Sequence, residues 1–108
     1  MTVKANVTLC VLLWPTEGNA DLLREYEDDV LALVPVYGGR VLSRVRALPG
    51  QDAALPSEVQ VIEMPDDDAL AAYLADPARV ALADVRDRVV ARTDIVRVGA
   101  VPHGDQTS

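Results

Sequence analysis

The chain of 108 residues has no phenylalanine and only one cysteine, one tryptophan and one histidine. The single cysteine, Cys10, excludes an internal disulfide framework and any zinc site built from several cysteines. The single histidine, His103, excludes a site with several histidine ligands, so we expect no metal. Basic residues are also scarce, and 17 acidic against 10 basic residues give a net charge of −7. This balance argues against nucleic acid as a partner, because phosphate binding needs clustered Lys and Arg.

Long hydrophobic runs are missing as well. The apolar stretch over residues 7–14 is far shorter than the roughly 20 residues that cross a bilayer, and it lacks a signal-peptide cleavage pattern. We therefore expect a cytoplasmic protein with no membrane partner. There is no phosphate-binding glycine loop and no nucleophile elbow, which excludes those enzyme classes. Half of the residues are hydrophobic, enough for one domain over residues 1–101, followed by a polar tail over residues 102–108.

The hydrophobic pattern predicts a β-α-β-β-α-β order of elements. Alternating and apolar stretches predict strands over residues 3–14, 40–47, 58–64 and 95–101. Helical spacing and capping residues predict a helix from Asn19 to about Gly38, and two more over residues 66–75 and 78–91. This order is the split βαβ of ferredoxin-like folds, an α+β class. Four antiparallel strands would carry the helices on one face and leave the other face uncovered.

The uncovered face of this sheet is the first candidate for function. We assign the uniformly apolar row of each strand to the helix side. The opposite rows then hold Lys4, Asn6, Thr8, Cys10, Leu12, Trp14, Arg40, Leu42, Arg44, Arg46, Gln60, Ile62 and Arg97. Such a face is too apolar for water and too polar for a core, which predicts a homodimer with a mixed cavity between two sheets. The cationic lining predicts an anionic or carbonyl-bearing small-molecule ligand.

Three residues of this region are candidate catalytic groups. Arg40 and Arg44 are four residues apart on one strand, close enough to clamp and stabilise one anionic group. The alternative is that each arginine pairs with a carboxylate on the sheet surface. Glu63 ends a predicted strand and would serve as a general base if burial raised its pKa. An ion pair of Glu63 with Arg40 or Arg44 is the favoured alternative.

Four further residues are candidates for substrate binding. Asn6 and Trp14 offer an amide and an aromatic ring to a flat carbonyl compound, although Trp14 also suits a seal between two copies. Tyr26 lies at helical spacing, which favours a core residue over a ligand contact. Arg97 adds a cation to the uncovered face. Cys10 has no activating neighbour in the sequence, so an inert buried thiol is favoured over a nucleophile.

Several motifs together resemble one uncharacterised bacterial family, the domain of unknown function 1330. The resemblance covers roughly residues 7–100 and departs from the family pattern at Met64, where phenylalanine is usual. It rests on Tyr26-Glu27, Gly38-Gly39-Arg40-Val41-Leu42-Ser43-Arg44, Val61-Ile62-Glu63-Met64-Pro65-Asp66, Tyr73, Asp76-Pro77, Arg86 and Asp94-Ile95-Val96. Members of this family resemble the dimeric α+β barrel superfamily, which includes cofactor-free monooxygenases, polyketide cyclases, haem proteins and plain binding subunits.

The resemblance implies a fold and a pocket, and the candidate residues in the predicted pocket indicate which chemistry it performs. We predict a cofactor-independent enzyme of the cyclase, isomerase or monooxygenase type, acting on an aromatic or polyketide-like carbonyl compound. Arg40 or Arg44 would stabilise charge, Glu63 would transfer a proton, and Asn6, Trp14 and Tyr26 would position the substrate. The alternative is a non-catalytic, homodimeric binding or stress-associated protein whose uncovered face is only an interface.

Overall fold

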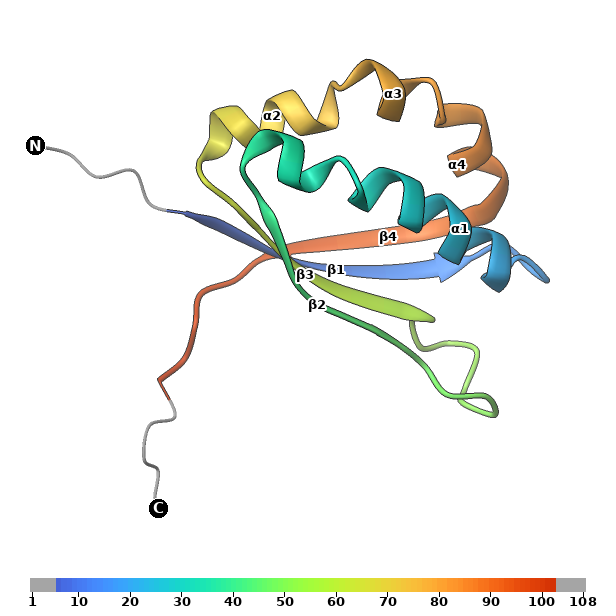
Figure 1. Ribbon diagram of the computed structural model, residues 1–108. Coiled ribbons are helices and arrows are strands. Elements are labelled where there is room, and N and C mark those ends of the chain that lie inside the picture. The colour runs from blue at the N-terminus through green and yellow to red at the C-terminus, as the bar shows by residue number, and fades with distance from the viewer. Residues whose placement is uncertain (1–5, 103–108) are drawn as a thin grey trace, which may run out of the picture.

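A computed structural model describes residues 6–102 and shows helices packed on one face of a four-stranded antiparallel sheet (Figure 1). The sheet has the strand order β2-β3-β1-β4. Its strands are β1 (Val7–Pro15), β2 (Arg40–Arg46), β3 (Glu58–Met64) and β4 (Val90–Arg97). The helices are α1 (Ala20–Leu31), the 3₁₀ turn η1 (Val34–Tyr37), α2 (Asp67–Leu74), α3 (Pro77–Val80) and α4 (Ala83–Val89). The predicted α+β order and the single covered face are confirmed.

Strand β1 lies inside the sheet, between β3 and β4. Its alternate residues Val7, Leu9, Val11 and Leu13 are buried beneath the helices, whereas Thr8, Cys10, Leu12 and Trp14 are half-buried on the other face. This alternation confirms the two predicted rows of the first strand. Residues 3–5, which the sequence adds to this strand, and residues 103–108 of the predicted tail lie outside the described residues.

Helix α1 buries a stripe that includes Leu23, Tyr26 and Val30 against the sheet. It ends at Leu31 rather than near Gly38, because Pro35 cannot continue the α-helical hydrogen bonding and the chain tightens into η1. Gly38 follows with φ of 80°, the left-handed conformation expected after a helical segment. Asn19 occupies the N-cap position, yet its side chain donates to Thr16 and to the Arg88 carbonyl instead of capping the helix.

The second crossover is broken into three short helices. Asp66 caps α2 by accepting from the Ala69 amide, and Asp76 caps α3 by accepting from the Ala78 amide. The single helix predicted over residues 78–91 is therefore wrong. Helix α4 runs directly into β4 at Val90, so the last strand covers Val90–Arg97 rather than residues 95–101.

The predicted faces of β3 are reversed in the structure. Glu58, Gln60, Ile62 and Met64 are buried on the helix side, and the more uniformly apolar row with Val59 and Val61 lies on the open face. The polar side chains are tolerated beneath the helices because both Glu58 and Gln60 have hydrogen-bonding partners there. Gln60 and Ile62 therefore do not belong to the uncovered face.

A register shift in β2 separates the two arginines that the sequence places on one face. Val41 pairs with Ile62, and Ser43 pairs with Val61, so one extra residue is inserted at this point. Before the shift, Arg40 pairs with Glu63 on the open face. After it, Arg44 pairs with Gln60 on the helix side. Arg40 and Arg44 consequently cannot clamp one anionic group together.

Arg97 also lies on the helix side rather than on the open face. Its strand partner is Leu9, a residue of the buried row of β1. The Arg97 guanidinium forms an ion pair with Asp67 in the first turn of α2. This pair ties the end of β4 to the start of α2, which is a structural role for Arg97.

Candidate functional site

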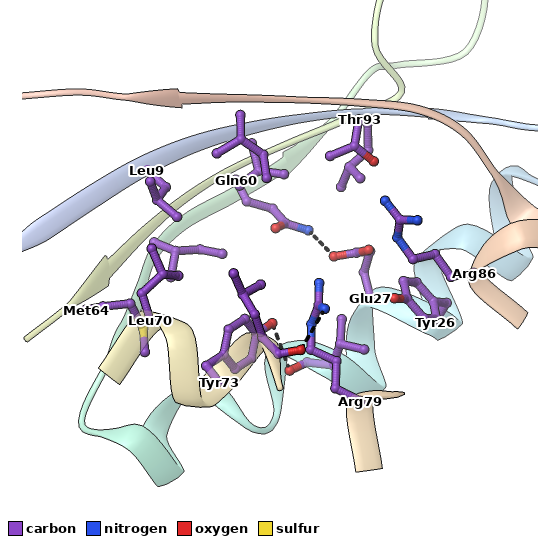
Figure 2. A pocket seen from close by; sticks show the side chains of 16 residues that line it. Leu9, Tyr26, Glu27, Gln60, Met64, Leu70, Tyr73, Arg79, Arg86 and Thr93 are labelled. Atoms are coloured by element: carbon purple, nitrogen blue, oxygen red, sulfur yellow. Dashed lines mark hydrogen bonds between the residues drawn. The ribbon is translucent and has the colours of Figure 1, made fainter. Parts of the chain in front are cut away.

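A cavity of about 80 Å³ lies between the sheet and the helices (Figure 2). Apolar side chains of β1, β3, α1, α2 and β4 form most of its wall: Leu9, Val11, Leu13, Ile62, Met64, Val30, Leu70, Leu74 and Ile95. Seven polar residues complete the lining: Tyr26, Glu27, Gln60, Tyr73, Arg79, Arg86 and Thr93. A mainly apolar pocket with a few converging polar groups is typical of a small-molecule site. We call this space the interlayer pocket.

Glu27 is the buried carboxyl group of the interlayer pocket. Only 6% of the residue is exposed, and its Oε1 accepts a hydrogen bond of 2.8 Å from the Gln60 side-chain amide (Figure 2). Loss of hydration raises the pKa of Glu27, and the nearby negative charge of Glu58 adds to this effect. The Gln60 hydrogen bond and the charges of Arg44 and Arg79 oppose it. A carboxyl group with a raised pKa is suited to proton transfer.

Gln60 links Glu27 to a second buried carboxylate. The two hydrogens of its amide nitrogen are shared between Glu27 and Glu58, each at 2.8 Å. Arg44 pairs with Glu58 at 2.6 Å and with Asp28 of α1 at 2.5 Å. The resulting chain of contacts holds the Glu27 carboxyl in one orientation. Arg44 thus acts on the pocket through other residues and does not line it.

Two tyrosines of the pocket wall remain neutral. Burial raises the pKa of both Tyr26 and Tyr73. The Tyr73 hydroxyl donates to the Val30 carbonyl at 3.2 Å, and the Arg79 guanidinium lies 5.2 Å from the Tyr73 ring centre. Tyr26 is the one predicted substrate-binding residue that lines this pocket.

The predicted catalytic pair Arg40 and Glu63 lies on the open face, outside the pocket. Their side chains form a salt bridge of 2.7 Å, which confirms the ion pair favoured for Glu63. Hydrogen bonds from Arg40 and Asn6 lower the pKa of Glu63, so burial does not prepare this group as a base. Whether Arg40, Arg44 or Glu63 takes part in catalysis stays a prediction.

Asn6 and Trp14 stand at opposite ends of β1. Eight residues of extended chain separate them by roughly 26 Å, so within one chain they cannot bind the same small molecule. Trp14 lies under the Arg92 guanidinium, 4.4 Å from the ring centre, and its Nε1 donates to the Ala54 carbonyl at 3.0 Å. It borders a broad groove of about 730 Å³ between the loops over residues 15–21 and 47–57.

Sequence reasoning missed most of the polar lining of the pocket. No catalytic or substrate-binding role is predicted from the sequence for Glu27, Gln60, Tyr73, Arg79, Arg86 or Thr93, and Gln60 is placed on the uncovered face instead. The signal in the sequence was a polar residue at a position whose spacing along the helix or strand places it on a buried face. Glu27 lies in the helical stripe of Leu23 and Val30, and Gln60 alternates with Ile62 in β3. A polar residue on a buried face needs a partner or a function.

Among residues 6–102, no group of three or more His, Cys, Asp or Glu side chains is placed to hold a metal ion. None of the helices in the same range is long and apolar enough to cross a membrane.

The chain matches no protein-family model and no curated protein, but its fold is similar to several solved structures. The RPA0582 protein of unknown function from Rhodopseudomonas palustris superposes with a TM-score of 0.73 at 16% identity, over 92% of this chain and 85% of that one. A dimeric protein of unknown function with a ferredoxin-like fold from Bacteroides fragilis gives 0.65 at 13%, over 92% and 100%. SnoaB, a cofactor-independent oxygenase from Streptomyces nogalater, gives 0.67 at 15%, over 90% and 94%. These likenesses establish that the chain has the ferredoxin-like α+β fold.

Proposed function

We propose that the protein is a cofactor-independent enzyme that acts on a small carbonyl compound in the interlayer pocket. The observation that carries this proposal is Glu27, a carboxyl group buried in a mainly apolar cavity, with a raised pKa and a fixed hydrogen-bonding partner. If this position served only the packing of the core, an apolar side chain would be favoured, because a buried carboxyl group is costly to desolvate. The activity of SnoaB, a cofactor-independent oxygenase of the same fold, supports the reaction class by analogy.

The proposed first step is abstraction of a proton from the carbon next to the carbonyl group. The Glu27 carboxylate takes the proton, and the electrons of the broken C–H bond move to the carbonyl oxygen, which gives an enolate. In a substrate with a C=C bond conjugated to the enolate, return of the proton to the far end of that bond isomerises the substrate, and attack of the enolate on a second carbonyl closes a ring. Reaction of the enolate with molecular oxygen would give an oxygenated product. All three predicted reaction types therefore share the same group.

The size of the pocket limits the substrate. The cavity of about 80 Å³ is smaller than an engineered cavity of about 150 Å³ that holds benzene. A compact carbonyl compound therefore fits the pocket as it stands. An aromatic or polyketide-like substrate requires the cover to move, and that cover includes the short helices α2 and α3, through Leu74 and Arg79.

The open face supports a homodimer as part of the proposal. Exposed valines lie on it, including Val45 at 56% and Val96 at 50% exposure, beside the half-buried Leu12. Burial of such a face against a second copy would remove apolar surface from water. The Bacteroides fragilis protein of the same fold is dimeric. Membership of the domain of unknown function 1330 stays part of the proposal.

Hydrogen–deuterium exchange in a simple ketone tests the catalytic part. The α-protons of 2-butanone exchange slowly with neutral D₂O, so NMR can follow catalysis by the purified protein. We expect Glu27→Gln to abolish the catalysed exchange. The matched control is Glu25→Gln, which removes an exposed carboxyl group from the same helix and should leave the rate unchanged.

Two outcomes would contradict the catalytic role. Exchange that survives in Glu27→Gln would assign catalysis to another group. Binding of the ketone with no exchange in any variant would favour the predicted alternative, a non-catalytic binding dimer.

A further inference from the structure

Two arginines of the interlayer pocket, Arg79 and Arg86, form no salt bridge with a carboxylate of residues 6–102; Arg24 and Arg88, which do not line the pocket, form none either. Arg40, Arg44, Arg46, Arg92 and Arg97 each have an Asp or Glu oxygen within 4.0 Å. For Arg79 and Arg86 no carboxylate of residues 6–102 lies within this distance. Figure 2 shows both side chains reaching toward the space around Glu27. Two unpaired cations beside an apolar cavity indicate a site for an anion.

Unsatisfied hydrogen-bonding atoms at the same place support this indication. The Arg79 Nε and the Thr93 Oγ1 are buried, and neither has a hydrogen-bonding partner. Most buried polar atoms in proteins are satisfied, so such atoms call for an explanation. Thr93 projects from β4 and Arg79 from α3, so their donors approach the pocket from opposite layers. An oxygen-rich group in the pocket would accept from both.

The charges also indicate how many anions the pocket takes. Arg79 and Arg86 supply two positive charges, and an ionised Glu27 supplies one negative charge. The second buried carboxylate, Glu58, is already neutralised by Arg44 at 2.6 Å. One further negative charge would therefore balance the pocket. This balance matters for Arg79, which is half-buried, because unbalanced charge is costly where water is excluded, whereas water screens the charge of the exposed Arg86.

We propose that the substrate is a compact keto acid whose carboxylate binds to Arg79, Arg86 and Thr93 while the carbon next to its ketone group faces Glu27. This inference rests on the proposed function and names its substrate class. The small cavity volume of about 80 Å³ favours a short chain. Leu74 and Ile95 are partly exposed at 42% and 56% and form an apolar rim through which such a molecule enters.

A pair of probes that differ only in charge tests the substrate class. Acetoacetate and acetoacetamide have the same number of heavy atoms and the same ketone, but only acetoacetate carries a carboxylate. By isothermal titration calorimetry, the wild-type protein should bind acetoacetate at least about tenfold more tightly than acetoacetamide, since hydrogen bonds to charged groups are the stronger ones.

Three variants locate the anion site. Arg86→Gln should remove most of the preference for acetoacetate, and Thr93→Val should reduce it without changing the shape of the wall. Arg88→Gln is the matched control, because Arg88 is exposed on the same helix α4 and lines a separate groove. It loses the same charge and should keep the preference.

Each other outcome overturns the proposal. Equal affinity for the two probes, no binding of either probe, or an equal loss in Arg88→Gln and Arg86→Gln would each exclude the anion site. The result also separates this inference from the proposed function. Exchange of ketone protons that depends on Glu27 without any preference for acetoacetate would retain the enzyme and remove the keto-acid class. Preference for acetoacetate without Glu27-dependent exchange would retain the anion site and remove the catalytic step.

Discussion

The two closest Arg–Glu pairs between β2 and β3 lie on opposite faces of the sheet. Arg44 and Glu58 meet on the helix side at 2.6 Å, where the Glu58 side chain is 1% exposed. Arg40 and Glu63 meet on the open face at 2.7 Å, where the side chains are 69% and 20% exposed. The residue types and distances are almost the same. The two pairs differ in burial and in what each glutamate contacts next.

Burial gives the two pairs different roles. The Gln60 side-chain amide donates hydrogen bonds to both Glu58 and Glu27, so the buried Arg44–Glu58 pair supports the wall of the interlayer pocket. Glu63 contacts Arg40 and Asn6 on a face that we propose to meet a second copy. An ion pair in water contributes little to stability, whereas a buried carboxylate that loses its partner is strongly destabilising. The comparison therefore predicts different responses to similar substitutions.

The largest effect is expected from breaking the buried pair. Arg44→Gln leaves the buried Glu58 with its hydrogen bond from Gln60 and with the more distant Arg46, at 3.6 Å, as its one remaining cationic partner among residues 6–102. We expect the free energy of unfolding to fall by about 3 kcal/mol, as for other buried pairs that lose one partner. Urea denaturation measures this change. Arg40→Gln is the control on the open face and should change the midpoint little, and equal losses in the two variants would remove the distinction between the faces.

A substitution on the open face should change assembly more than the fold. Val96→Glu places a charge on the surface proposed to pair with a second copy, and we expect the dimer to dissociate into folded monomers. Light scattering after gel filtration measures the mass. Val80→Glu is the control, since Val80 is similarly exposed, at 58%, on α3. A wild-type protein that is already monomeric would contradict the role proposed for this face.

A smaller effect, which depends on pH, is expected at Glu27. Burial raises the folded-state pKa of Glu27 above its usual 4.5, so the folded protein holds this proton up to a higher pH than the unfolded chain does. As the pH rises from about 4.5 through the folded-state pKa, ionisation costs stability that Gln does not lose. Glu27→Gln should therefore raise the melting temperature at pH 8 and match the wild type at pH 4. Thermal unfolding followed by circular dichroism measures this difference, and a higher melting temperature for wild type at pH 8 would contradict the burial argument.

The fold could be predicted from the sequence because its signals are local. The period of two in β1, the Gly38-Gly39 pair and Pro65 mark elements that the structure confirms. The chemistry could not be predicted in the same way. The register shift in β2 follows no glycine or proline between Val41 and Ser43, so the change of face at Arg44 leaves no mark in the sequence.

The buried polar residues show the same limitation. Glu58 and Gln60 are tolerated beneath the helices because Arg44 and Glu27 satisfy them. These partners are 14 and 33 residues away in the chain. The hydrophobic pattern of β3 predicts that its apolar row is buried beneath the helices. The pattern contains no information on the hydrogen-bonding partners that other elements contribute to the polar row. The tertiary contacts, rather than the period, decide which row is buried.

We place the functional site in the interlayer pocket and not on the open face of the sheet. The most direct test is a titration of ¹⁵N-labelled protein with acetoacetamide, the neutral probe, followed by backbone amide shifts in NMR spectra. We expect the largest shifts at Glu27, Gln60 and Thr93. Shifts confined to Thr8, Val61 and Glu63, on the open face of the sheet, would contradict this placement of the site.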